Sequence, residues 1–185
     1  MVLPRWLQAE APPATPAVTF SEVYESQVDF VWRVARRLGV ADAALDDCVQ
    51  DVFVVVHARL AGFEGRSSLR TWVYGITRRV ARDHRPSRRE APLDDTDALP
   101  AAGATAHEQL ERTERVRLLQ RLLDGLDEGS REVFILSELE EVPMPEVAAA
   151  LGINVNTGYA RLRAARRDLE ASLARHRAQH VGRLP

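Results

Sequence analysis

The chain has 185 residues, a formal net charge of −2 and a hydrophobic content of 45%. This composition excludes wholesale disorder and allows one domain or two small ones. No apolar run approaches the roughly 20 residues that a membrane span needs, and the first residues lack the apolar core and basic start of a signal peptide. We therefore expect a cytoplasmic protein without membrane insertion.

The small net charge conceals four blocks of opposite sign. Residues 66–89 carry a charge of +7 and residues 161–183 carry +5, whereas residues 90–114 carry −6 and residues 124–146 carry −7. Both basic blocks are suited to phosphate. A chain that alternates in this way is better suited to contact both a nucleic acid and a protein than a nucleic acid alone.

The first half of the chain is predicted to form a three-helix bundle. Apolar residues recur at three-to-four spacing over residues 20–39, 42–60 and 67–86, which is typical of amphipathic helices. The single cysteine, Cys48, falls inside the second pattern. We interpret it as a buried structural thiol.

The second half repeats the helical pattern after a proline-containing acidic stretch. Four helices are expected: around residues 118–126, around 133–136, from about 143 to 151, and from about 155 to 173. No strand pattern of useful length is present, so the predicted fold class is all-α, with two small helical domains joined by a flexible linker. The expected boundaries are 1–18 for a flexible extension, 19–88 for the first domain, 89–107 for the acidic linker, 108–175 for the second domain and 176–185 for a tail.

The strongest local signal is a helix-turn-helix at residues 144–165. Ala148 lies four residues before Gly152 and lets two helices approach closely, and Gly152 can adopt the left-handed conformation of the turn. The second helix would present its N-terminal side chains to the major groove of DNA. The candidates for base or nearby phosphate contact are Asn156, Thr157, Tyr159, Ala160 and Arg163, and those for backbone phosphate are Arg161, Arg166 and Arg167. The alternative is a helical hairpin with a solvated basic helix.

Residues 63–85 combine an apolar helix face with an arginine track. Such a track supplies salt-dependent affinity for phosphates, and aromatic rings beside it, Phe63 and Tyr74, are candidates to stack on an unpaired base. The alternative is a solvated face with aromatic residues in the core, and for Trp72 alone the core is favoured. The candidate DNA contacts of this segment are Phe63, Arg66, Ser67, Ser68, Arg70, Trp72, Tyr74, Arg78, Arg79, Arg82 and Arg85.

Residues 45–53, LDDCVQDVF, form a third segment of interest. Asp46, Asp47 and Asp51 give this predicted helix an acidic face with no basic residue. Acids near a helix N-terminus are favourable in themselves. The pattern alone therefore does not indicate a function.

The sequence contains no recognisable pattern of catalytic or metal-binding residues. There is no P-loop and no catalytic triad. His176 and His180 share an i, i+4 spacing without a third ligand, and His84 and Asp83 are adjacent on a helix and so point apart. We expect no enzyme activity, no cofactor and no metal site.

These three segments, in this order, resemble the extracytoplasmic-function sigma factors, and the resemblance covers residues 20 to about 173. LDDCVQDVF resembles the segment that docks on the clamp helices of the polymerase β′ subunit. FEGRSSLRTWVYGIT, residues 63–77, resembles the segment that melts the minus-ten element and captures a flipped base. Residues 126–169 are similar to the region that binds the minus-thirty-five element and the β-subunit flap.

The resemblance implies partners and residue roles. The partners would be core RNA polymerase and promoter DNA, and an anti-sigma protein is left open as a third. The acidic linker would enter the RNA exit channel and the active-site cleft. The implied polymerase contacts, or residues that support them, are Asp46, Asp47, Gln50, Asp51 and Phe53, and the implied base-holding loop is Phe63, Glu64, Gly65, Arg66, Ser67 and Ser68.

Two residues depart from the pattern of this family. Arg79 stands where the family commonly has an Asn that helps to hold the flipped base. Gly158 replaces an apolar residue of the helix-turn-helix core, at a cost of about 1 kcal/mol in helix propensity. The promoter sequence therefore does not follow from the resemblance.

A conventional dimeric helix-turn-helix regulator is the competing hypothesis. Residues 20–89 would then serve as a dimerisation or sensor bundle. A purified dimer that binds a palindromic duplex without polymerase would favour it.

Overall fold

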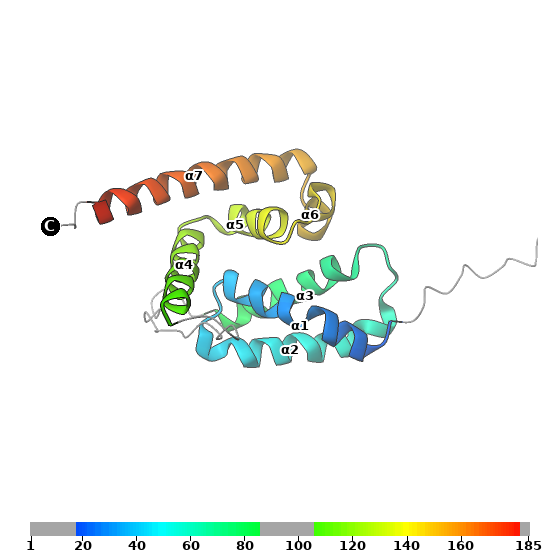
Figure 1. Cartoon of the computed structure of the whole chain (residues 1–185). Helices are drawn as coiled ribbons and strands as arrows, with labels where there is room; N and C mark the ends of the chain where they lie inside the picture. Colours follow the sequence, from blue (N-terminus) through cyan, green and yellow to red (C-terminus); the bar gives the residue numbers. More distant parts are fainter. Residues whose placement is uncertain (1–17, 86–105, 182–185) are drawn as a thin grey trace, which may run out of the picture.

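The computed structural model describes residues 18–85 and 106–181, which are helical with short connections and contain no strand (Figure 1). This confirms the predicted all-α fold class. Most of the predicted N-terminal extension and linker lies outside the described residues. Within the described ranges, no helix is both long and apolar enough to cross a membrane.

Three helices form the first domain. Each of the outer two begins at a side-chain cap: the Thr19 hydroxyl accepts a hydrogen bond from the backbone N–H of Glu22, and the Ser68 hydroxyl accepts one from the N–H of Thr71 at 3.2 Å. Such caps satisfy backbone donors that a helix end leaves unpaired. The elements are α1 (Phe20–Arg37), the turn η2 (Asp42–Ala44), α2 (Leu45–Arg59), the turn η3 (Leu60–Gly62) and α3 (Leu69–His84).

The core of this bundle consists of apolar residues from all three helices. Val31, Val52 and Val73, one from each helix, are completely buried. Cys48 lies among them, and burial together with the nearby charge of Asp51 raises the pKa of its thiol to about 11. The thiol therefore stays protonated at neutral pH and serves as a small apolar side chain.

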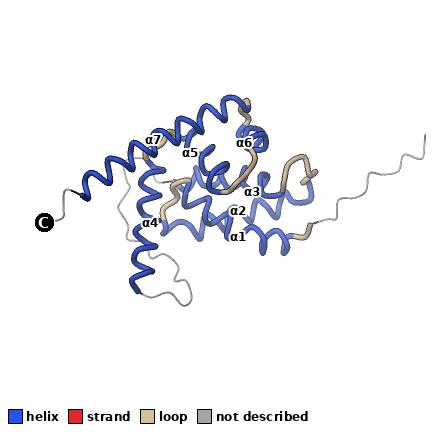
Figure 2. The backbone as a smooth tube through the Cα atoms, turned by 45° about the horizontal axis from the view of Figure 1, so that its top comes forward, coloured by secondary structure: helices blue, strands red, loops and turns tan. Residues whose placement is uncertain are grey.

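The second domain consists of four helices and one π-helical turn (Figure 2). The last helix ends at Val181, eight residues beyond the expected end at Leu173. It continues into the predicted tail because no glycine or proline interrupts residues 159–181. The elements are α4 (Ala106–Asp124), α5 (Glu128–Phe134), the π-helical turn η4 (Ile135–Leu139), α6 (Met144–Leu151) and α7 (Val155–Val181).

The two domains lie directly against each other. Helix α6 contacts α3, and one cluster of buried apolar residues includes members of both domains. The Arg131 side chain of α5 is 4% exposed and donates a hydrogen bond to the backbone carbonyl of Arg37 at the end of α1, at 2.8 Å. Figure 1 shows the resulting layers, with α2 at the bottom, α1 and α3 above it, then α5 and α6, and α7 on the far side.

Candidate functional surfaces

A groove of about 700 Å³ lies between α1 and α2. The Phe53 side chain forms its floor and is 4% exposed, with its ring 4.7 Å from that of Tyr24. Tyr24 and Val54 are exposed by 44% and 61%. Large apolar side chains at such exposure beside an open groove are typical of a protein-docking surface.

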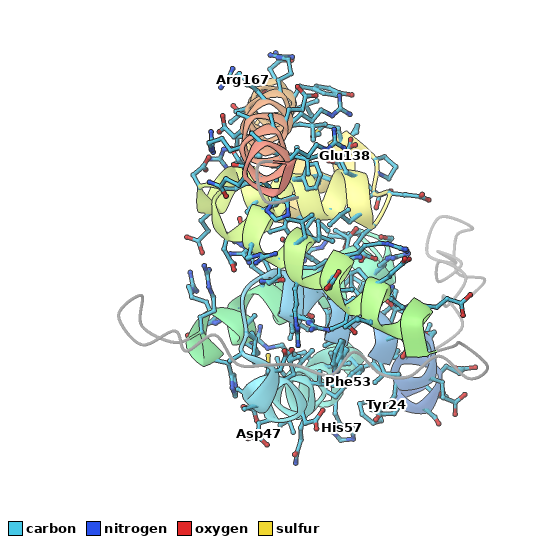
Figure 3. All side chains as sticks on the ribbon, turned by 60° about the vertical axis from the view of Figure 1, so that its left-hand side comes forward. Tyr24, Asp47, Phe53, His57, Glu138 and Arg167 are labelled. Carbon is cyan, nitrogen blue, oxygen red and sulfur yellow. The ribbon has the colours of Figure 1, made fainter. Side chains whose placement is uncertain are left out.

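Two of the polar residues predicted on α2 line this groove. Asp46, Asp47, Gln50 and Asp51 are all exposed, and Asp46 and Gln50 line the hollow itself. Asp51 also lies 2.8 Å from the imidazole of His84 on α3, a contact that sequence reasoning did not anticipate. In Figure 3 the labelled Asp47, His57, Phe53 and Tyr24 gather at the end of the molecule opposite α7. The surface is apolar at its centre and acidic at its edge.

A second hollow, of about 140 Å³, lies where the η3–α3 loop meets α3. The Phe63 and Trp72 rings stand 5.1 Å apart at 46° and form one of its walls. The loop turns through Gly65, whose φ of 68° lies in the left-handed region that favours glycine. The hollow thus brings together most of the predicted base-holding loop, and its lining is Gly62, Phe63, Glu64, Arg66, Ser67 and Trp72.

Tyr74 does not suit the stacking role predicted for it. Its side chain is completely buried, and burial raises the pKa of its hydroxyl. The ring points into the bundle because its position on α3 belongs to the same face as Val73 and Thr77, which are also completely buried. The sequence left open both a ring that stacks beside the arginine track and an aromatic residue of the core, and packing places Tyr74 in the core.

The predicted arginine track on α3 faces the second domain. Arg78 pairs with Glu132, and Arg85 pairs with Glu128 at 3.2 Å. Arg70 pairs with Glu140. Arg79 and Arg82 are exposed instead. Three of the predicted phosphate contacts are therefore occupied by carboxylates of the same chain.

The start of α3 is also in contact with the helix-turn-helix. Glu146 of α6 accepts hydrogen bonds from the hydroxyls of Ser68 and Thr71, at 3.0 and 3.1 Å. Two segments predicted to read different parts of DNA thus lie side by side. The sequence carries no signal for this contact, which joins residues more than 70 positions apart.

The helix-turn-helix has the expected geometry. Gly152 ends α6 with a φ of 65°, and Ala148 is 2% exposed where the helices approach. On α7 the predicted reading positions are solvent-exposed: Asn156, Thr157, Tyr159, Ala160 and Arg163.

The remaining arginines of α7 differ in their exposure and in their contacts with other residues of the chain. Arg166 donates a hydrogen bond to Glu138 at 2.6 Å, while Arg167 is 74% exposed and lies 3.7 Å from its neighbour Asp168. Figure 3 shows the Arg167 side chain pointing away from the first domain. Arg161 is half-buried and packs over Gly129 at the start of α5. Arg167 is thus the most available of the predicted phosphate contacts.

Gly158 is explained by its neighbour. A Cβ atom at this position would come within 2.5 Å of the Met144 sulfur. The thioether of Met144, 6% exposed, therefore fills the space that a larger residue of α7 would occupy. In the core of the helix-turn-helix, Met144 thus takes the place of the apolar residue that is usual at position 158.

Comparison with known proteins gives matches to both domains. Residues 23–90 match the model of Sigma-70 region 2, and residues 117–169 match that of Sigma-70, region 4. The chain is 31% identical over 151 residues to RNA polymerase sigma factor CnrH of Cupriavidus metallidurans, covering 76% of this chain and 79% of CnrH. It is 30% identical over 151 residues to the ferric citrate uptake sigma factor FecI of Escherichia coli, covering 77% and 84%.

Solved structures share the fold. CnrH in complex with the cytosolic domain of CnrY superposes with a TM-score of 0.65 at 28% identity, over 84% of this chain and 87% of CnrH. RpoE of Bartonella quintana, in complex with the anti-sigma factor NepR, gives a TM-score of 0.62 at 21% identity, over 84% and 96%. The second likeness concerns the fold alone.

Proposed function

Because the chain belongs to the extracytoplasmic-function sigma factors of the sigma-70 family, we propose that it binds core RNA polymerase, recognises minus-ten and minus-thirty-five promoter elements, and promotes strand separation. Sigma factors are transcription initiation factors. The observation that carries the proposal is the presence, in one chain and in the family's order, of both matched regions.

The α1–α2 groove is the proposed docking surface for polymerase. Its exposed apolar residues, Tyr24 and Val54, supply area that is buried on binding. Asp47, exposed on the same helix as Val54, supplies charge that selects a basic partner. Phe53 contributes by supporting the floor of the groove from the core. Because the groove faces away from the second domain, it is accessible in the docked arrangement.

The hollow at Phe63 and Trp72 is the proposed site for an extruded base of the minus-ten element. A flipped base stacks on aromatic side chains, and such stacking offsets an unpairing cost of a few kcal/mol. Ser67 and Arg66 provide polar groups at the wall of the hollow. Arg79 and Arg82, exposed on the following turns of α3, are placed to meet the adjacent backbone.

Helix α7 is the proposed reader of the minus-thirty-five element. Tyr159, Ala160 and Arg163 share one exposed face near its N-terminus, the part of a recognition helix that enters the major groove. Arg167 lies farther along and suits a backbone phosphate. Binding rather than catalysis is the proposed contribution of this chain, and it acts in the cytoplasm with the polymerase.

Residues 19–88 and 108–175 are the proposed domains, and the acidic linker between them would allow them to engage DNA at two positions. A protein that binds in place of polymerase is a further proposed partner. This follows from the likeness to CnrH, which is bound by the cytosolic domain of CnrY.

Transcription in vitro with core polymerase tests the proposal. Addition of the purified chain should yield transcripts whose start sites share two upstream elements, and core polymerase alone should not. If no genomic fragment gives a promoter-dependent transcript, the proposal is wrong. The dimeric regulator predicts the opposite: a dimer that binds a palindromic duplex tightly without polymerase.

A further inference from the structure

Three guanidinium groups surround one buried carboxylate at the domain interface. Glu140 follows η4, and its side chain is 1% exposed. It is contacted by Arg37 of α1 and Arg70 of α3, and by Arg33 of α1 at 3.5 Å. Neither Arg33 nor Arg37 belongs to the predicted DNA-binding residues.

The cluster holds more positive charge than Glu140 balances. One carboxylate meets three guanidiniums, and the pKa of Arg37 is lowered by burial first and, to a lesser degree, by the charges of Arg33 and Arg70. Arg70 also has its Nε buried without a hydrogen-bond partner, while its guanidinium lies 4.6 Å from the centre of the Phe30 ring. A donor is therefore left over in the cluster.

An anion with more acceptor oxygens than a carboxylate suits such a cluster better. Guanidinium groups bind phosphates through paired, charge-assisted hydrogen bonds. Arg33 and Arg70 are 44% and 42% exposed even with Glu140 in place, so a ligand could reach them if Glu140 moved away. The cluster adjoins the proposed minus-ten surface, because Arg70 lies two residues after the Ser68 cap of α3.

While the two domains are packed against each other as in the structure, they cannot bind both promoter elements at once. Elements centred about 25 base pairs apart are roughly 85 Å apart along B-form DNA, at about 3.4 Å per base pair. In the structure, the helix-turn-helix touches the start of α3 through Glu146 and Thr71, whose oxygens are 3.1 Å apart. The domains must separate, and separation withdraws Glu140 from the three arginines.

We propose that Arg33, Arg37 and Arg70 form a binding site for a DNA backbone phosphate, which Glu140 occupies until the domains separate. This inference rests on the proposed function, because it assumes that promoter DNA is the ligand of α3. Glu140 and DNA then compete for the same guanidinium groups. The proposal therefore predicts that the free chain binds DNA weakly.

Replacement of Glu140 tests the competition. In the full chain, Glu140→Gln should increase the radius of gyration measured by small-angle X-ray scattering. It should also tighten binding to a fluorescein-labelled single-stranded 20-mer about tenfold and steepen its dependence on salt by about 0.7 unit, the value for one phosphate gained on a single strand. The matched control is Glu141→Gln. It removes the same charge at the neighbouring position, where the side chain is exposed. It should change neither measurement.

A second substitution shows whether the cluster is the source of the gain. Arg33→Ala or Arg37→Ala, introduced into the Glu140→Gln chain, should abolish most of the gain in affinity while leaving the chain expanded. Circular dichroism checks that every variant keeps its helix content. The proposal is wrong if the Glu140→Gln chain expands without a gain in affinity, if neither quantity changes, or if the gain persists without the arginines.

These outcomes are separate from failure of the proposed function. If the chain is not a sigma factor of the proposed kind, the wild type gives no promoter-dependent transcript, whatever the oligonucleotide measurements show. If only the present inference fails, wild-type transcription is intact, and affinity for the oligonucleotide does not respond to Glu140 or depends on other residues.

Discussion

Helices α3 and α7 are both rich in arginine, but the two helices differ in whether the other domain holds these arginines. On α3, Arg70 and Arg78 are held by carboxylates of the other domain. On α7, Arg163 is exposed, and Arg167 points away from the first domain (Figure 3). Charge density in the sequence thus indicates a potential for binding phosphate, but domain packing decides which arginines are available.

The inner surfaces, at which the two domains contact each other, and the outer surfaces, which face solvent, should likewise respond differently to substitution. Substitutions on the inner surface should change stability, because they leave buried groups without partners. Substitutions on the outer surfaces should change binding of polymerase or DNA and leave stability nearly unaltered. The following predictions test this division, from the largest expected effect to the smallest.

Arg78→Ala should destabilise the protein by roughly 2–3 kcal/mol, since it leaves the Glu132 carboxylate, 4% exposed, without its guanidinium partner. Because Arg78 is partly exposed, the expected loss of stability is smaller than for a fully buried ion pair. Urea unfolding followed by circular dichroism measures it. Arg82→Ala, on the same helix but exposed, is the control and should stay within about 0.5 kcal/mol of wild type. Equal effects of the two would remove the distinction between inner and outer arginines.

Arg163→Ala should relax preference at one or two base pairs of the minus-thirty-five element, a loss of about 1–3 kcal/mol of discrimination. Arg167→Ala should instead weaken binding to all sequences about equally and lower the salt slope by roughly one unit. Transcription from a promoter library with each variant separates the two effects. If Arg167→Ala changes the preferred sequence and Arg163→Ala does not, the reading face of α7 has been assigned wrongly.

Asp47→Arg should weaken binding to core polymerase about tenfold, or about 1.4 kcal/mol, because Asp47 is exposed on α2 and a partner selected by its charge would be repelled. Fluorescence anisotropy of labelled protein with core polymerase measures the affinity. Asp83→Arg, an equal reversal of charge on α3, serves as the control and should bind normally. Unchanged affinity of the Asp47 variant would exclude this part of α2 from the interface.

Gly158→Ala should give no net stabilisation, because a gain of about 1 kcal/mol in helix propensity is opposed by contact with the Met144 sulfur. In a Met144→Ala background the same substitution should become stabilising. A double-mutant cycle in urea unfolding measures the coupling. Additive effects would show that Met144 does not fill the space beside Gly158.

The helix-turn-helix and the bundle core were largely predictable from sequence. Gly152 has the left-handed backbone expected of the turn, and Cys48 is buried as expected. These features depend on local conformational preference and on the period of apolar residues. Both are properties of short segments.

Tyr74 and the end of α7 show where local reasoning was wrong. An aromatic residue beside arginines fits a stacking surface or a core equally well, and only the packing of α1 and α2 against α3 places Tyr74 inside. The end of α7 was predicted too early because the periodic apolar pattern ends before the helix ends. Helix-forming residues then continue it to Val181.

By itself, the sequence determined the all-α class, the order of the two domains and the residue types of each candidate surface, since amphipathic periodicity and turn chemistry are encoded within a few neighbouring residues. Only the tertiary structure decided which charges meet. The contacts of Glu140 with Arg37 and Arg70 join residues 103 and 70 positions apart. No periodic pattern specifies such partners, because they follow from how whole domains pack.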